Sequence, residues 1–199
     1  MSDVSSGGTD LAQARRCVER AFADRSYPGD ERIGETDSRY EDYEGHAVTA
    51  FHRRKKWHEL TLRHLLDEYA GDPSACLAFM VPEGWRYYLP AYLLMALERN
   101  EADVITDAII GALTHPRARA AAFARVAQDL DLDPEVVLDE HTERFEQRMS
   151  GLTAAELAAV RTVLVHLAQR ADADNVRFGA VLPNAAREAL GSWEHRPSP

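Results

Sequence analysis

The chain has 199 residues, of which 45% are hydrophobic, so it suits one domain that buries its own core without disulfides. Its net charge of −10 argues against a general affinity for nucleic acid or anionic membranes, because both reward positive charge. The two cysteines, Cys17 and Cys76, form no CxxC pair and suggest free thiols in a reducing compartment, with a disulfide between them left open.

The N-terminus, residues 1–8, is polar, and we expect it to be flexible. It lacks the basic segment and apolar run of a signal peptide, which points to a cytoplasmic protein. A helix is predicted from Thr9 or Asp10, with apolar residues at helical spacing, and it ends before the turn signal Ser26-Tyr-Pro-Gly-Asp30. Residues 26–50 are expected to form an acidic loop.

A second helix is predicted over residues 56–69, and a short one over residues 74–80. The stretch Leu77–Leu97 holds a Phe, a Trp and three Tyr, and it marks the structural centre. Pro82 fits the first residue of a helix, and Pro90 is expected to break or kink that helix before it restarts. The apolar run at 87–97 is far shorter than the roughly 20 residues that span a bilayer, so no membrane association is expected.

The second half of the chain continues the helical pattern. Asp133-Pro134-Glu135 has the form of a capped helix start, and Thr153-Ala-Ala-Glu156 is a capping box for a helix that runs to about Arg170. Further helices are expected at 101–113, 116–130 and 184–190, and residues 116–149 are expected to form an inserted helical hairpin.

No window alternates apolar and polar residues with a period of two. The sequence therefore predicts an all-α fold, a single compact domain over residues 9–191 with roughly six to nine helices. Residues 192–199 are expected to be a frayed tail.

Histidine spacing does not indicate a metal site. His46, His52, His58 and His64 are six residues apart, a step that turns successive side chains away from one helix face. His58-Glu59 precedes His64 by two residues too many for the zinc motif His-Glu-x-x-His. We expect no cofactor.

The residues Asp129, Asp131, Asp133, Glu135 and Glu140 fall at positions 1, 3, 5, 7 and 12 of a calcium loop. Position 6 is Pro134, however, where such a loop needs a glycine with positive φ. The same residues already read as a capped helix start, so calcium is a near miss.

Acidic residues dominate this part of the chain, with seven acids and no Lys or Arg from Asp129 to Glu143. Such a face would suit a basic partner. Asp139, Glu140 and Glu143 are the candidate partner-binding residues.

Two further constellations deserve a functional hypothesis. Glu83, Arg86 and Tyr87 lie among apolar neighbours, with His64 as a possible helper, and form a candidate catalytic site. The alternative is a structural ion pair between Arg86 and Glu83. Arg53-Arg54-Lys55-Lys56, next to Trp57, is the only compact basic patch and a candidate for binding nucleic acid; the alternative is a solvated helix entry.

Several blocks carry a family likeness: Ser26–Asp30, Phe51 with Trp57–Leu60, Leu77–Tyr92 and Leu152–Leu157. They resemble an uncharacterised bacterial family, domain of unknown function 6714, over residues 20–97 and 145–167. The Pro-Glu-aromatic-Arg-Tyr-Tyr-Leu-Pro-Ala pattern is its specific block, and here Gly84 replaces an expected alanine. The resemblance implies a small soluble bacterial protein and supplies no activity.

The leading hypothesis is a non-catalytic cytoplasmic protein that binds another protein, because recognisable catalytic spacing is absent and the charge is acidic. An immunity or antitoxin-like role against a basic toxin is one version, and a regulatory role is another. The first alternative is an enzyme with its site at Glu83, Arg86 and Tyr87. The second is a nucleic-acid-associated regulator that uses Arg53–Lys56.

Overall fold

The computed structural model describes residues 10–35, 43–98 and 103–194, and all statements on structure refer to them. These residues form nine α-helices and three short 3-10 helices, and their only β pairing is an isolated bridge between Gly34 and Met80. The all-α prediction is therefore confirmed. The elements are α1 (Leu11–Ala21), η1 (Asp30–Arg32), α2 (Tyr43–His52), η2 (Trp57–Glu59), α3 (Leu62–Glu68), α4 (Pro82–Leu97), α5 (Asp103–Leu113), η3 (Pro116–Arg119), α6 (Ala120–Asp129), α7 (Pro134–Ser150), α8 (Ala154–Phe178) and α9 (Ala185–Glu194).

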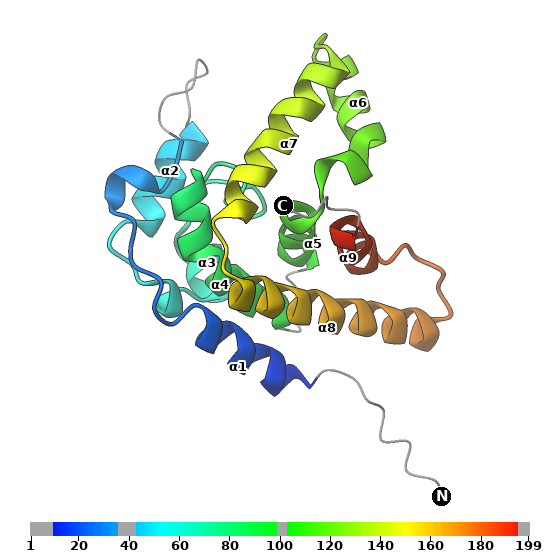
Figure 1. Cartoon of the computed structure of the whole chain (residues 1–199), viewed down its shortest axis with the longest axis horizontal. Helices are drawn as coiled ribbons and strands as arrows, with labels where there is room; N and C mark the ends of the chain where they lie inside the picture. The colour runs from blue at the N-terminus through cyan, green and yellow to red at the C-terminus, as the bar shows by residue number, and fades with distance from the viewer. Residues whose placement is uncertain (1–9, 36–42, 99–102, 195–199) are drawn as a thin grey trace, which may run out of the picture.

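Helix α4 lies at the centre of the fold, packed against α1, α5, α7, α8 and η2 (Figure 1). From Tyr87 to Leu97 its side chains are aromatic or apolar, and nearly all of them are buried, whereas Glu83 in its first turn is exposed. Trp85, Tyr88 and Tyr92 are among the largest fully buried side chains. The aromatic segment that the sequence singled out is therefore core.

The two prolines of α4, Pro82 at its start and Pro90 in its interior, have different effects on the helix. Pro82 occupies the first turn as predicted, where its missing N–H leaves no bond unmade. The expected restart at Pro90 is wrong, because α4 continues through it as one helix. An internal proline costs about 3 kcal/mol through a lost hydrogen bond and a clash. Burial of the surrounding aromatic residues offsets that cost.

Helix α8 is long and lies along one side of the molecule, with α1 and α9 packed against it (Figure 1). Its capping box is confirmed: Thr153 N–H donates to Glu156 Oε2 at 2.7 Å, and Glu156 N–H donates to Thr153 Oγ1 at 3.2 Å. The helix runs past the expected end at Arg170 to Phe178, where Gly179 adopts a φ of +61°.

Several local expectations differ from the structure. Residues 43–50, expected as loop, belong to α2, while the predicted helix at 56–69 is divided into η2 and α3 because Thr61 caps a new start. The residues at 74–79 form turns instead of a helix. At the C-terminus α9 extends to Glu194, so part of the expected frayed tail is helical. Residues 1–8, 36–42 and 195–199 lie outside the described part.

Candidate functional site

Helices α6 and α7 form a hairpin, here called the arm, that projects from the rest of the molecule (Figure 1). Asp133 caps α7 by accepting the Glu135 N–H at 2.9 Å, and Pro134 occupies the first turn as predicted. The turn between the helices closes with Leu132 N–H donating to the Ala127 carbonyl at 2.8 Å. Its residue Asp131 has a φ of 55°, a conformation that aspartate tolerates better than most residues.

The tip of the arm exposes apolar side chains that no core residue covers. Their exposed fractions are 51% for Val126, 63% for Leu130, 49% for Leu132 and 53% for Val136. These four residues, here called the apolar tip, lie at the end of α6, in the turn and at the start of α7. An exposed cluster of large apolar residues on a projecting element is typical of an interaction surface.

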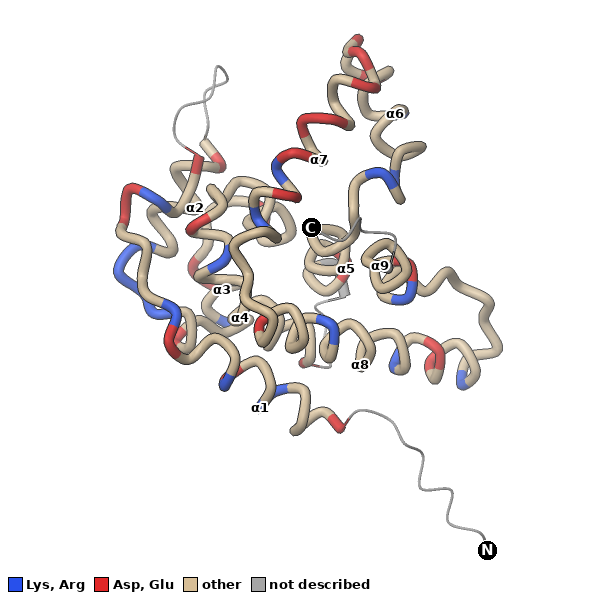
Figure 2. The backbone as a smooth tube through the Cα atoms, in the orientation of Figure 1, with Lys and Arg blue, Asp and Glu red and all other residues tan. Residues whose placement is uncertain are grey.

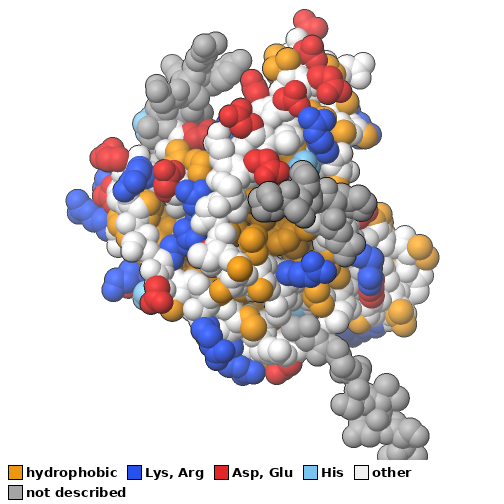
Figure 3. All heavy atoms as spheres, viewed as in Figure 1, with side chains coloured by type: hydrophobic (Ala, Val, Ile, Leu, Met, Phe, Trp, Pro, Cys, Tyr) orange, Lys and Arg blue, Asp and Glu red, His pale blue; other side chains and the backbone are white. Residues whose placement is uncertain are grey.

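Acidic residues surround the apolar tip and continue down α7. Figure 2 shows them on both sides of the turn and along α7, and Figure 3 shows acidic and hydrophobic side chains together at the end of the arm. The three predicted partner-binding residues are exposed on α7. Asp139 accepts a hydrogen bond from Arg117 Nη2 at 2.8 Å, and Glu143 accepts one from Gln147 at 3.2 Å. Glu143 is one helical turn from both Asp139 and Glu140, so the three share one side of α7.

The acidic residues with near-calcium-loop spacing are not brought together as ligands. Asp133 is engaged as the cap of α7, and Glu140 lies further along that helix. Across residues 10–35, 43–98 and 103–194, no group of three or more His, Cys, Asp or Glu is placed to hold a metal ion.

The candidate catalytic residues lie on the first turns of α4 but point into different surroundings. Glu83 and Arg86 line a hollow of about 230 Å³ together with Arg25 and Arg32. Arg86 donates to the Gln147 carbonyl at 2.8 Å, and its guanidinium lies so close to Gly151 that a Cβ there would be 2.6 Å from it. Its principal bond is thus to a backbone carbonyl instead of to Glu83.

Tyr87 is buried and packs against Tyr27, with the two ring centroids 5.3 Å apart in an edge-to-face arrangement. It lines a second hollow, of about 410 Å³. His64 lies on α3, where its Nδ1 is 3.1 Å from the Glu59 carbonyl, and it lines neither hollow. The four candidate catalytic residues are therefore not brought together.

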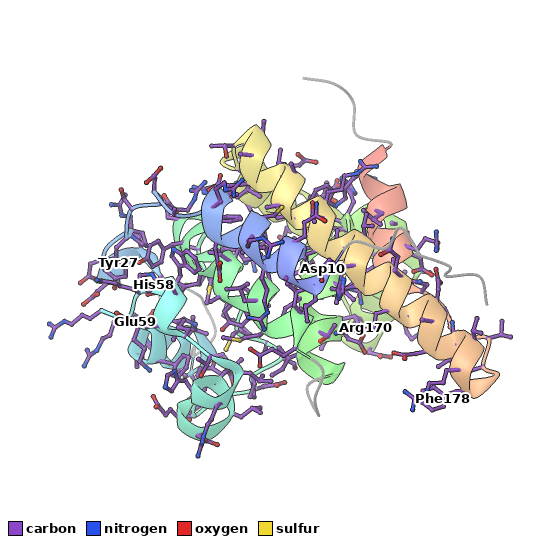
Figure 4. All side chains as sticks on the ribbon, turned by 90° about the horizontal axis from the view of Figure 1, so that it is seen from below. Asp10, Tyr27, His58, Glu59, Arg170 and Phe178 are labelled. Carbon is purple, nitrogen blue, oxygen red and sulfur yellow. The ribbon has the colours of Figure 1, made fainter. Side chains whose placement is uncertain are left out.

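The second hollow contains three residues of the basic patch, Arg54, Lys55 and Lys56, beside Trp57. Figure 4 shows Tyr27, His58 and Glu59 at this end of the molecule, with Phe178 at the opposite end. Two of the four basic side chains of the patch are paired at the surface: Lys55 with Glu68 at 3.1 Å, and Arg54 with Asp30 at 3.6 Å. Exposed pairs of this kind contribute little, so the argument against the nucleic-acid interpretation is the net charge of −10.

Arg25 lines both hollows, yet it is committed to a structural pair. Its guanidinium donates two hydrogen bonds to Glu156, at 2.6 and 2.5 Å, and a third to the Gly151 carbonyl at 3.0 Å. Arg25 and Thr153 together hold the pKa of the Glu156 carboxyl below its ordinary value, even though burial acts to raise it. The bidentate pair joins the end of α1 to the start of α8.

A polar cluster is buried against α4. His52 contacts the Tyr92 hydroxyl at 3.0 Å, and burial lowers the pKa of its imidazole to about 3. Burial also raises the pKa of the Cys76 thiol to about 11, which disfavours the reactive thiolate form. Cys17 and Cys76 are both free thiols.

Sequence reasoning found the acidic side of the arm and missed its apolar tip. The sequence did hold a signal, the apolar residues at 126, 130, 132 and 136 in and next to an acidic stretch. Their spacing does not give a continuous helical stripe that could pack against the core.

Among the described helices, none alone has the length and apolar character to cross a membrane; α7 and α8 meet those criteria only as a pair, across a bend of 115°.

A family model described as a family of unknown function (DUF6714) matches residues 10–193. No curated protein matches the chain. No solved structure matches it either.

Proposed function

The chain belongs to a family of unknown function, DUF6714, and from that premise we propose that it is a non-catalytic protein whose arm binds another protein. The partner we propose has an apolar groove rimmed by Lys and Arg side chains. A cytoplasmic location is part of the same proposal, in keeping with the two free thiols.

The observation that carries the proposal is the apolar tip within its acidic surround. Leu130 is 63% exposed and Val136 is 53% exposed, on a hairpin whose helix α6 packs chiefly on α7 and η3. Binding interfaces combine an apolar centre with a polar rim, and the arm has this arrangement. The seven acids from Asp129 to Glu143, with no Lys or Arg among them, favour a partner whose rim is positively charged.

A second exposed apolar patch lies at the end of α8, where Val176 is 85% and Phe178 is 71% exposed. The sequence beside it carries charges of both signs, Asp172 and Asp174 with Arg177, whose Cζ lies 5.2 Å from the Phe178 ring. The patch therefore lacks the contiguous run of acids found on the arm, and it supplies a control for variants of the apolar tip.

The test compares variants of the full chain as bait in a lysate of the source organism. Leu130→Ser with Leu132→Ser removes two of the four side chains of the apolar tip, and Val176→Ser removes an apolar side chain elsewhere that is more exposed than either. We expect a stoichiometric partner that wild type and Val176→Ser retain and the double variant loses. A partner retained by all three, or lost with Val176→Ser alone, would refute binding through the arm.

Charge is tested on the purified pair. The triple variant Asp139→Asn, Glu140→Gln, Glu143→Gln is expected to weaken binding about tenfold at low salt, with a smaller effect at high salt. The control is Glu19→Gln, Asp24→Asn, Glu31→Gln, which neutralises three exposed acids outside the arm. Equal affinities for the two triple variants would contradict the proposal. Sedimentation of the chain alone separates a second copy from a different partner, since self-association lost in Leu130→Ser would place another copy on the tip.

A further inference from the structure

A cavity of about 470 Å³ lies at the base of the arm, away from the apolar tip. Residues of α5, η3, α6 and α7 line it, together with the turns that precede α4. Its volume is within the range of pockets that hold small organic molecules. Three arginines reach it, Arg119, Arg144 and Arg148, against one carboxylate, Asp107.

Arg148 is the unusual member, because it is a buried cation without a carboxylate partner. Its exposed fraction is 7%, and its Nη2 donates to the carbonyls of Ala78 and Met80, both at 2.8 Å. Its Nε is buried and has no hydrogen-bond acceptor, and no ion pair of Arg148 occurs in the described part of the chain. Glu35, which acts on Arg148 through its charge, makes its own ion pair with Arg144 at 3.4 Å.

Burying a cation is energetically unfavourable unless an anion or a full set of hydrogen bonds compensates it. Two carbonyl bonds compensate Arg148 in part, and burial lowers the pKa of its guanidinium to about 10. A cation in this condition that faces a cavity can be neutralised by an anionic ligand.

The rest of the cavity adds charge and shape. Arg119 lies over α5 at Gly111, where a Cβ would be 2.9 Å from its Nη1, so the glycine leaves room for the guanidinium. His141 faces the same space, and burial together with the charges of Arg144 and Arg148 lowers the pKa of its imidazole. A neutral imidazole keeps a donor and an acceptor for a ligand.

Apolar side chains form the remaining walls. Phe123 stacks at a tilt against His141, with ring centroids 4.6 Å apart, and Phe145 lies edge-on to His115 at 5.1 Å. Aromatic walls in a cavity that three arginines also line favour a ligand with an apolar body and one oxyanion group.

We propose that this cavity binds a small organic oxyanion, a carboxylate or a phosphate ester, with the anionic group between Arg119, Arg144 and Arg148 and the apolar body against Phe123 and Phe145. The site is independent of protein binding at the apolar tip, so either proposal can stand if the other fails.

The test uses the full chain with four probes: benzoate, phenyl phosphate, the neutral isostere benzamide and inorganic phosphate. Binding is followed by amide chemical-shift changes in NMR spectra and by thermal shift. For probes of this size we expect a Kd on the order of 1 mM for at least one of the two organic anions. Benzamide should bind at least about tenfold more weakly. Benzoate against phenyl phosphate then decides between carboxylate and phosphate, and inorganic phosphate reports on the value of the apolar body.

Variants at Arg119 and Arg144 carry the test, because Arg148 also holds the turn at Ala78 and Met80. Arg119→Gln and Arg144→Gln are each expected to weaken the anion about fivefold or more. Arg125→Gln is the matched control, an exposed arginine on α6 that does not line the cavity. The proposal is overturned if neither organic anion binds by about 20 mM, if benzamide binds as well as benzoate, or if Arg119→Gln, Arg144→Gln and Arg125→Gln behave alike.

Discussion

The buried imidazole of His52 makes the stability of this fold depend on pH above the range in which carboxylates titrate. The ring is fully buried, with Nδ1 2.8 Å from the Val48 carbonyl and Nε2 3.0 Å from the Tyr92 hydroxyl. A carbonyl only accepts, so Nδ1 carries the proton and Nε2 accepts from Tyr92. Protonation of Nε2 would break that bond and place a charge in the core, which is why burial lowers the pKa to about 3.

The sign and size of the effect follow from linkage. In the unfolded chain His52 regains a pKa near 6.5, so below that pH the unfolded state binds a proton that the folded state refuses. The free energy of unfolding therefore falls as pH falls, by about 2 kcal/mol between pH 7.5 and pH 5. Glu156 and Asp30, whose pKa values are lowered in the fold, add their losses only at more acidic pH.

Urea unfolding of wild type and His52→Gln across this pH range measures the effect, with His46→Gln, an exposed ring on α2, as the control. The slope between pH 7.5 and pH 5 should shrink in His52→Gln and change little in His46→Gln. NMR of the histidine rings gives a second readout, in which the His52 ring of the folded protein keeps its neutral shifts down to pH 4. A folded-state His52 pKa above about 5, or an unchanged slope in His52→Gln, would refute the reasoning.

Three substitutions test the packing around α4 and the helix ends, all by urea unfolding. Gly84→Ala should destabilise by about 1–3 kcal/mol, because a Cβ there would lie 2.7 Å from Ile33 Cα; stability equal to wild type would mean that this close approach is not real. Glu156→Ala should cost about 3–5 kcal/mol by leaving Arg25 without its carboxylate, and a loss below about 1 kcal/mol would show the pair to be dispensable. Arg54→Gly should stabilise by roughly 1 kcal/mol, since Arg54 has a φ of 61° and its ion pair is exposed; a net loss would assign the side chain a larger role.

The sequence predicts correctly those helix starts that have a capping residue, a first-turn proline or a capping box of their own. The cap at Asp133, the proline at Pro82 and the capping box at Thr153 all mark real helix starts. Each signal satisfies end groups of its own helix, so it can be interpreted without knowledge of the tertiary fold.

The sequence does not predict elements that depend on contacts with distant residues. It predicts a loop where most of α2 lies, because the helix has a weak apolar stripe and its stabilising contacts come from elsewhere in the chain. Gly34 N–H donates to Thr49 Oγ1 at 3.1 Å, and the Tyr69 hydroxyl donates to Glu44 at 3.0 Å. The same limit applied at Pro90, where tertiary burial outweighs a local helix-breaking preference.

The candidate sites also differ in whether the sequence alone reveals them. The acidic character of the arm is visible in the sequence because its residues are contiguous from Asp129 to Glu143. The cavity at its base is not, since Arg119 and Arg148 are 29 residues apart and line one cavity only in the folded chain. Conversely, His64, which the sequence analysis grouped with Glu83, Arg86 and Tyr87, lines neither of their hollows.

The most direct test of protein binding through the arm is amide hydrogen exchange of the full chain, with and without its purified partner. The account predicts that the partner slows exchange most over residues 126–143, which hold the apolar tip and the acidic residues of α7. Protection centred on residues 176–182 or on the hollow at Tyr27, with the arm exchanging as in the free protein, would contradict it.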